Sequence, residues 1–156
     1  MAGVVVLCAV LALVAGCGGD GVHVEEYAVG SSARDSCRAL LKELPDEVAG
    51  QDRRTVSGSA YAAAWGDPAI VLRCGAALPR SFRGDPCITR NGIGWSLPLK
   101  QADDATLDAT MTLAFREPVL QVRVPADYRP NGPSEVMADL DAVVRARTTS
   151  TGKHCS

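Results

Sequence analysis

Histidine is scarce in this chain of 156 residues, and its scarcity limits the chemistry that the protein can perform. The two histidines, His23 and His154, lie near opposite ends of the sequence. A Ser-His-Asp or Cys-His nucleophile therefore has no base in the central part of the chain. No glycine-rich phosphate loop opens a helix, and no stripe of stacking aromatics runs among basic residues. These absences argue against the common nucleophilic hydrolases and against phosphate-loop enzymes.

A net positive charge is also absent, because 18 acidic residues outnumber the 16 lysines and arginines and the formal net charge is -2; most of the positive charge is arginine, since lysine occurs only at positions 42, 100 and 153. A strongly basic surface is therefore absent, and we expect no nucleic-acid partner. Hydrophobic residues make up 47% of the chain and charged residues 22%, which is typical of a globular protein rather than a disordered one. The length suits one domain.

The cysteines lack the spacing of a zinc site, because no pair reads Cys-x-x-Cys and no histidine lies between Cys37 and Cys155. Cys8 and Cys17 belong to the N-terminal segment, which leaves Cys37, Cys74, Cys87 and Cys155. An even number of cysteines in an exported domain favours disulfides, and we expect no metal or other cofactor. We favour pairing Cys74 with Cys87 and Cys37 with Cys155. The alternative pairs Cys37 with Cys74.

The first apolar run, Val4 to Val14, is too short to span a bilayer but suits a signal peptide. It ends in Val14-Ala15-Gly16-Cys17, which resembles the lipobox of bacterial lipoproteins. The resemblance implies cleavage of residues 1–16 as a signal peptide and a diacylglycerol on Cys17. We therefore expect an extracytoplasmic protein that acyl chains hold at the outer face of the cell membrane. The alternative is an ordinary secretory signal followed by a chance cysteine.

The rest of the chain divides into a predicted flexible tether, residues 17–32, and a single domain, residues 33–156. An apolar stripe before Pro45 predicts the first helix of this domain, with Cys37 facing the core. A second stripe predicts a helix that Ser134 caps; its members are Val136, Met137, Leu140, Val143 and Val144. We expect both helices to pack on one face of a sheet.

Alternating apolar and polar residues predict that this sheet is antiparallel and has about five strands. The clearest alternation covers Thr106 to Phe115, where Leu107 is among the residues expected to face inward. A last strand has Leu120, Val122 and Val124 inward, with Gln121 and Arg123 outward. Asn91-Gly92 predicts a tight hairpin, because a type I′ turn needs positive φ at both central residues. The fold class is therefore α+β, stapled by disulfides.

A hairpin at the centre of the chain carries most of the candidate binding residues. Two extended runs flank the turn Gly66-Asp67-Pro68, with Trp65 before it and Arg73 after it. Trp65 and Trp95 would form a platform for a carbohydrate if both were exposed, although buried aromatics beside turns are commoner. Asp67, assisted by Arg73, is the candidate carboxylate for catalysis on a cell-wall polymer.

Several of these segments resemble one protein family. Four segments are similar to an actinobacterial family of small envelope lipoproteins: the run from Cys37 to Pro45, the Arg53-Arg54 pair, the run from Ala62 to Gly75 and the run from Asn91 to Trp95. That family is known only as domain of unknown function 3515. The resemblance implies a membrane-anchored envelope protein, and it supplies no catalytic residues.

Two functions follow from the sequence. The first is a non-catalytic binding or scaffold module in the envelope, whose partner is an envelope protein or a cell-wall glycan. The alternative is a hydrolase or transferase that acts on the cell wall with carboxylates alone. Asp67, Arg73, Trp65 and Trp95 are the candidate binding residues for either function.

Overall fold

The fold is built on an antiparallel sheet of eight strands, seen in a computed structural model that describes residues 21–83 and 85–155. The order across the sheet is β2-β3-β5-β6-β11-β9-β8-β7, and every neighbouring pair is antiparallel. The strands are β2 (Glu47–Val48), β3 (Gln51–Arg54), β5 (Ala62–Trp65), β6 (Ile70–Cys74), β7 (Cys87–Arg90), β8 (Ile93–Ser96), β9 (Ala109–Ala114) and β11 (Leu120–Val124).

The sheet is larger than the five strands expected from the sequence. The extra strands are short: β2 has two residues, and its alternation cannot be recognised in so brief a segment. Two further pairs lie outside the main sheet. β1 (Val22–Val24) pairs in parallel with β4 (Val56–Gly58), and β10 (Arg116–Glu117) pairs antiparallel with β12 (Thr149–Ser150).

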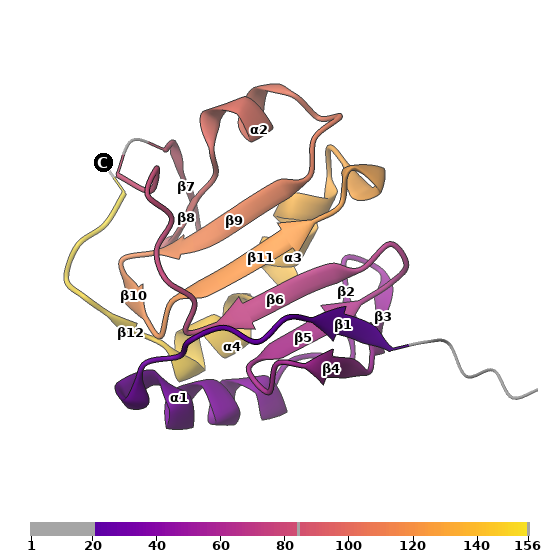
Figure 1. Cartoon of the computed structure of the whole chain (residues 1–156). Coiled ribbons are helices and arrows are strands. Elements are labelled where there is room, and N and C mark those ends of the chain that lie inside the picture. Colours follow the sequence, from indigo (N-terminus) through magenta and orange to yellow (C-terminus); the bar gives the residue numbers. More distant parts are fainter. Residues whose placement is uncertain (1–20, 84, 156) are drawn as a thin grey trace, which may run out of the picture.

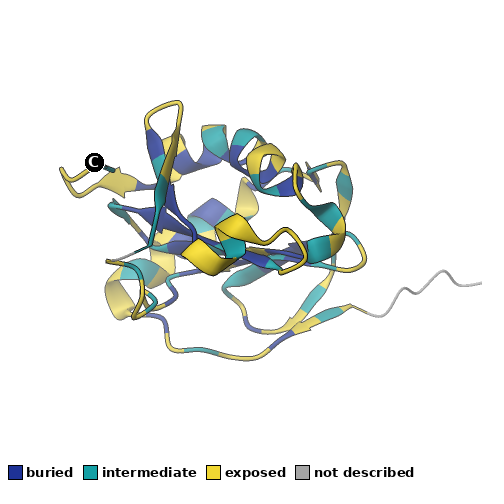
Figure 2. Cartoon of the chain, turned by 90° about the horizontal axis from the view of Figure 1, so that it is seen from above, coloured by how far each residue is buried: buried dark blue, intermediate teal, exposed yellow. Residues whose placement is uncertain are grey.

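Three helices bury one face of the sheet, which we call the packed face. They are α1 (Ser31–Lys42), α3 (Gly132–Asp139) and α4 (Asp141–Arg147), and their apolar residues join the same core cluster as the strands. In Figure 1, α3 and α4 lie behind the sheet while β1 crosses in front of it. Figure 2 shows that buried segments concentrate on the strands and on the sides of the helices that meet them. The structure is thus a mixed helix and sheet fold, as expected, while the number and placement of its helices differ in detail from the two that the sequence predicts.

The helix ends differ from the prediction in detail. The second predicted helix is two helices, α3 and α4, which meet at Leu140, and α3 begins at Gly132 rather than after a Ser134 cap. The Ser134 hydroxyl instead donates to the Asn131 carbonyl at 2.8 Å. Two short elements were not expected: α2 (Leu99–Asp103) and the 3-10 helix η1 (Ala126–Tyr128).

The strand predictions hold for the last strand of the sheet prediction, β11, and for β6. Leu120, Val122 and Val124 are fully buried, as are Ile70 and the other inward residues of β6. Asn91 and Gly92 have φ values of 49° and 76°, and they join Arg90 to its partner Ile93 as the predicted turn requires. The prediction for Leu107 is wrong, because β9 begins only at Ala109 and Leu107 is 42% exposed.

Candidate functional site

The two tryptophans belong to the core and offer no platform for a carbohydrate. Trp65 is 0% exposed and Trp95 is 2% exposed, so the buried interpretation of both residues is correct. The Trp65 indole donates to the Pro45 carbonyl at 3.0 Å, and the Arg53 guanidinium lies 5.3 Å from the Trp65 ring centroid. The indole N–H of a buried tryptophan usually has a hydrogen-bond partner.

Arg53 has a structural role beside that tryptophan. Its guanidinium donates to the carbonyl of Leu41 at 3.3 Å, in the last turn of α1, and to the carbonyl of Leu44 at 3.2 Å, just beyond the end of this helix. These carbonyls have no partner within the helix, so a cation here both satisfies them and suits the helix dipole. Burial lowers the pKa of Arg53, while Asp46 acts to raise it. Arg53 thus joins α1 to the sheet.

Asp67 and Arg73 are not brought together. Asp67 is an exposed residue of the turn before β6, whereas Arg73 is the fourth residue of that strand. A strand rises about 3.3 Å per residue, so three steps from Ile70 to Arg73 already separate the turn from the arginine by about 10 Å. The neighbour of the turn is Tyr128, whose hydroxyl donates to the Pro68 carbonyl at 2.8 Å. The predicted assistance of Asp67 by Arg73 has no support in this geometry.

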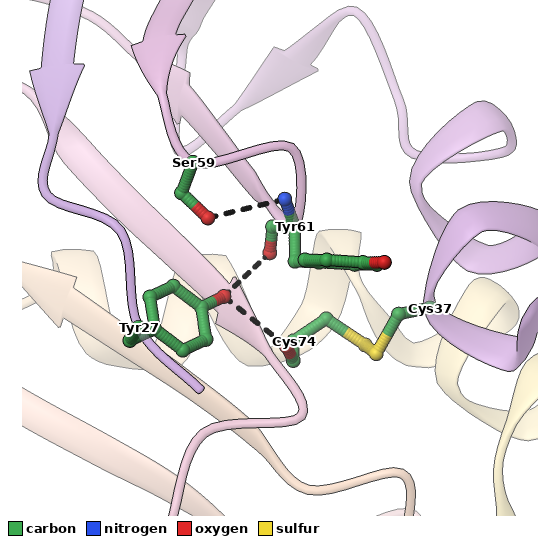
Figure 3. Close-up of a disulfide and its surroundings, with 5 residues drawn as sticks. All are labelled: Tyr27, Cys37, Ser59, Tyr61 and Cys74. Atoms are coloured by element: carbon green, nitrogen blue, oxygen red, sulfur yellow. Dashed lines mark hydrogen bonds between the residues drawn. A yellow bond between two sulfur atoms is a disulfide. The ribbon is translucent and has the colours of Figure 1, made fainter. Parts of the chain in front are cut away.

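The favoured disulfide pairing is wrong, and the alternative for Cys37 is confirmed. Cys37 bonds to Cys74, and Cys87 bonds to Cys155, each with a Cα–Cα distance of 5.6 Å (Figure 3 shows the first). Cys37 and Cys74 are both fully buried on the packed face.

The second disulfide lies on the opposite face of the sheet, which we call the outer face. A Cβ added at Gly94 would collide with the Cys155 sulfur and would lie 3.4 Å from the Cys87 sulfur. Gly94 alternates with the buried Ile93 and Trp95, so its Cβ position points away from the packed face. The sheet itself therefore separates Cys37 from Cys155 and Cys74 from Cys87, which excludes the favoured pairing.

The N-terminal segment is part of the folded domain from residue 21 onward, so the tether prediction is wrong for residues 21–32. The Val22 amide donates to the Thr55 carbonyl at 2.8 Å, and the Ser59 amide donates to the Val24 carbonyl at the same distance. Val24 is 3% exposed. Residues 17–20 of the predicted tether lie outside the described residues, as do Cys17 and the predicted signal peptide.

Tyr27 fixes the next part of this segment to the sheet. Its hydroxyl donates to the carbonyls of Tyr61 at 2.7 Å and Cys74 at 3.1 Å (Figure 3). The Arg73 guanidinium lies 5.7 Å from the centre of the Tyr27 ring. Burial raises the pKa of Tyr27; a hydrogen bond from Ser59, the bond to Cys74 and the charge of Arg73 act in the opposite direction.

A row of polar side chains crosses the outer face beside this segment. The strand register pairs Arg73 with Gln121, Gln121 with Thr112, and Thr112 with Ser96. Arg123 stands two residues from Gln121 on the same strand, so it is a diagonal neighbour of Arg73. Gln121 donates to the Ala77 carbonyl at 3.0 Å, which ties the loop after β6 to this row.

Between β1 and this row lies a pocket of about 250 Å³, which we call the outer pocket. Its lining residues come from β1, β6, β11 and the turn before β6; they are Val22, His23, Val24, Ala69, Val71, Arg73, Gln121 and Arg123. The sequence had placed Gln121 and Arg123 on the outward face of their strand. The sequence could not supply the pairing of β6 with β11, because even their closest paired residues, Cys74 and Leu120, are 46 positions apart in the chain.

A second pocket, of about 340 Å³, lies where α1 begins. It is lined mainly by small side chains together with Glu117; the others are Ser32, Ala33, Ser36, Gly75, Ala76, Pro118, Val119 and Thr149. No described residue of this lining is a cation. Elsewhere in residues 21–83 and 85–155 there is no group of three histidine, cysteine or acidic residues that could hold a metal ion.

Comparison with known proteins gives a family but no activity. Residues 1–151 match a family described as a protein of unknown function, DUF3515. No curated protein and no solved structure matches the chain. The match covers nearly the whole sequence, and the chain therefore belongs to the DUF3515 family.

Proposed function

We propose that the protein is an envelope lipoprotein, anchored by acyl chains on Cys17, whose folded domain is a non-catalytic binding module outside the cell membrane. The observation that carries the proposal is the pair of disulfides, Cys37–Cys74 and Cys87–Cys155, within one small domain. Disulfides form and persist in oxidising compartments and are rare in the cytosol. They therefore support an extracytoplasmic location.

The anchor rests on the sequence. Val14-Ala15-Gly16-Cys17 has the small residues that precede a lipidated cysteine in bacterial lipoproteins. Among the described residues, no helix has both the length and the apolar character needed to cross a bilayer. Two or more acyl chains hold a protein stably at a membrane, whereas one chain gives only reversible binding.

The choice of a binding module over an enzyme rests on what the outer face contains. Its polar row includes arginines, a glutamine and hydroxyls, while Asp67 lies in the turn beside Tyr128 rather than beside Arg73. A glycosidase that works with carboxylates needs two of them about 5–9.5 Å apart around the scissile bond. The polar row and the outer pocket fit recognition of a ligand better than bond cleavage.

The test replaces each N-terminal cysteine in turn and follows lipid attachment in the native host. We expect Cys17→Ser to abolish incorporation of a labelled fatty acid and to release the protein from the membrane fraction. Cys8→Ser is the matched control, because it changes a cysteine nine residues earlier, within the apolar run. Retention of label in Cys17→Ser, or four alkylatable thiols in the native protein, would contradict the proposal.

A further inference from the structure

The outer pocket combines cationic and hydrogen-bonding side chains without an acidic neighbour in its lining. Arg73, Arg123 and His23 line it together with Gln121, and none of the described lining residues carries a carboxylate. Ligand pockets for drug-sized molecules are usually about 300–1,000 Å³. A pocket of about 250 Å³ therefore suits a small anionic group better than an extended polymer.

Arg73 is the cation best placed to meet such a group. Within the described part of the chain it forms no ion pair, and its guanidinium lies over the face of the Tyr27 ring, 5.7 Å from the centroid. Stacking on an aromatic ring holds a guanidinium in place while its N–H donors remain at the ring's edge. The residue is exposed, so these donors are accessible from the pocket.

Arg123 supplies a second set of donors on the neighbouring strand. One of its terminal nitrogens pairs with Asp108, which also accepts a hydrogen bond from the Ala126 amide at 2.9 Å. An arginine has five N–H donors, so this ion pair leaves others unused. Diagonal neighbours on adjacent antiparallel strands lie about 7–8 Å apart, a separation that two arginines can bridge through one shared anion.

The position of the pocket limits where its ligand comes from. Val22, His23 and Val24 form one wall, and residue 21 is the fourth residue after Cys17. Four residues of extended chain reach at most about 14 Å. If Cys17 carries the anchor that we propose above, residue 21 lies within that distance of the headgroups and the β1 wall of the pocket follows directly after it; this step of the argument rests on the proposed function.

We propose that the outer pocket binds a phosphate group through Arg73 and Arg123, with His23 and Gln121 at its rim. The phosphate belongs to an anionic lipid headgroup or is free in solution, and both sources present oxygens that a guanidinium recognises through paired hydrogen bonds. Anchored next to the membrane, the domain would recognise lipid headgroups rather than the apolar layer.

The test measures binding to the purified full-length protein in a nonionic detergent. The probes are inorganic phosphate, dihexanoyl phosphatidylglycerol and dihexanoylglycerol, which has the same acyl chains and no phosphate. NMR signals of His23 and Gln121 report on the pocket. We expect saturable shifts with a phosphate-bearing probe and an affinity lowered about tenfold or more in Arg73→Gln, because a hydrogen bond to a charged group is lost.

Arg38→Gln is the matched control. Arg38 is exposed, and its guanidinium also lies over a tyrosine ring, that of Tyr61, at 5.6 Å, but it belongs to α1 and not to the pocket. The control removes the same charge and the same kind of stacking, so its affinity for the probe should equal that of the wild type. Thermal unfolding of both variants shows whether the fold is intact.

Each outcome decides the proposal. Tighter binding of the anionic lipid than of inorganic phosphate identifies the headgroup as the source, whereas equal binding identifies free phosphate. Equal binding of dihexanoylglycerol, an equal loss in both variants, or no saturable shift would overturn the phosphate site. Because phosphate binding does not depend on acylation, native protein that carries no lipid on Cys17 but still binds phosphate would refute the anchor and leave the phosphate site standing.

Discussion

The two faces of the sheet differ in how they are covered and in what they contain. The packed face is closed by α1, α3 and α4, and its residues, such as Leu72 and Val122, are fully buried. The outer face is covered only in part, by the N-terminal segment with β1, the loop after β6 and the C-terminal tail, and it keeps Arg73 and Arg123 exposed. One face is closed by apolar packing, and the other leaves polar side chains open to solvent.

Each face also has its own disulfide. Cys37–Cys74 joins α1 to β6 on the packed face, and Cys87–Cys155 holds the tail on the outer face. If the packed face is the source of stability, the first disulfide should matter more, even though it closes the shorter segment of 37 residues against 68.

The largest expected effect follows from removing each disulfide in turn. In the chain-entropy model, loss of either cross-link costs about 4 kcal/mol of unfolding free energy. We expect the double variant Cys37→Ala with Cys74→Ala to lose at least this much unfolding free energy, because both sulfurs are fully buried and their removal leaves a cavity. Cys87→Ala with Cys155→Ala should lose roughly half of it or less, because the released tail can fray.

Urea unfolding of both double variants measures the two losses. The tail is attached by other contacts, including Arg116, whose guanidinium donates to the Thr148 hydroxyl and carbonyl at 2.7 and 2.8 Å. An equal or larger loss for the Cys87–Cys155 pair would mean that the outer face is as important for stability as the packed face.

A smaller effect is expected at Gly58, where β4 meets β1. Gly58 has a φ of 85°, and an added Cβ would collide with the Val24 carbonyl. We expect Gly58→Ala to cost about 1–3 kcal/mol and to detach β1 locally. Hydrogen exchange should accelerate at the Ser59 amide, which donates to that carbonyl, and should not change in β6.

The Gly92→Ala variant is the control, because it introduces backbone strain without a collision of the added Cβ. Gly92 has a similar φ of 76°, but nothing lies within 4 Å of its Cβ position. It should cost only the strain of the left-handed conformation, about 1–2 kcal/mol, without faster exchange at Ser59. Equal exchange at Ser59 in the two variants would show that the N-terminal segment is not held by this contact.

The smallest effect concerns Tyr27 and depends on pH. Tyr27→Phe removes the hydrogen bonds to Tyr61 and Cys74 and should cost about 1 kcal/mol at neutral pH. Burial raises the pKa of Tyr27 in the folded protein, so the folded state keeps the phenol neutral after the unfolded state has ionised. The contribution of the neutral Tyr27 phenol to the free energy of unfolding is complete below about pH 10 and is lost as the pH rises through the raised pKa.

The wild type should therefore lose stability above about pH 10 more steeply than Tyr27→Phe. Burial also raises the pKa of Tyr128, so the variant should keep part of the alkaline loss. Denaturant unfolding at several pH values measures both slopes. Parallel slopes for the wild type and Tyr27→Phe would show that Tyr27 is not protected from solvent in the folded state.

The contrast between the faces also explains what the sequence could predict. Strands that bury one side and expose the other have a clear period of two, and this period placed Leu120, Val122 and Val124 correctly. The Asn91-Gly92 turn was predictable because its conformation depends on local sterics alone. The packed face was therefore largely predictable.

The elements that cover the outer face could not be predicted, because no local sequence pattern marks them. β1 has three residues and pairs with β4 across 34 positions, so no local signal marks it. The tail that brings Cys155 to the outer face likewise has no period that gives its direction. The pairing of Arg73 with Gln121, which builds the polar row, depends on contacts between strands far apart in the chain.

The most direct test of the account measures which face lies near the membrane. The full-length protein, with the acyl anchor that we propose, is placed in a bilayer disc that contains lipids with a spin label on the headgroup, and amide signals are compared by NMR. We expect strong broadening at Val22, His23 and Arg73 on the outer side and little at Leu40 or Val144 on the packed side. Broadening that is equal on both faces, or stronger at the helices, would contradict it.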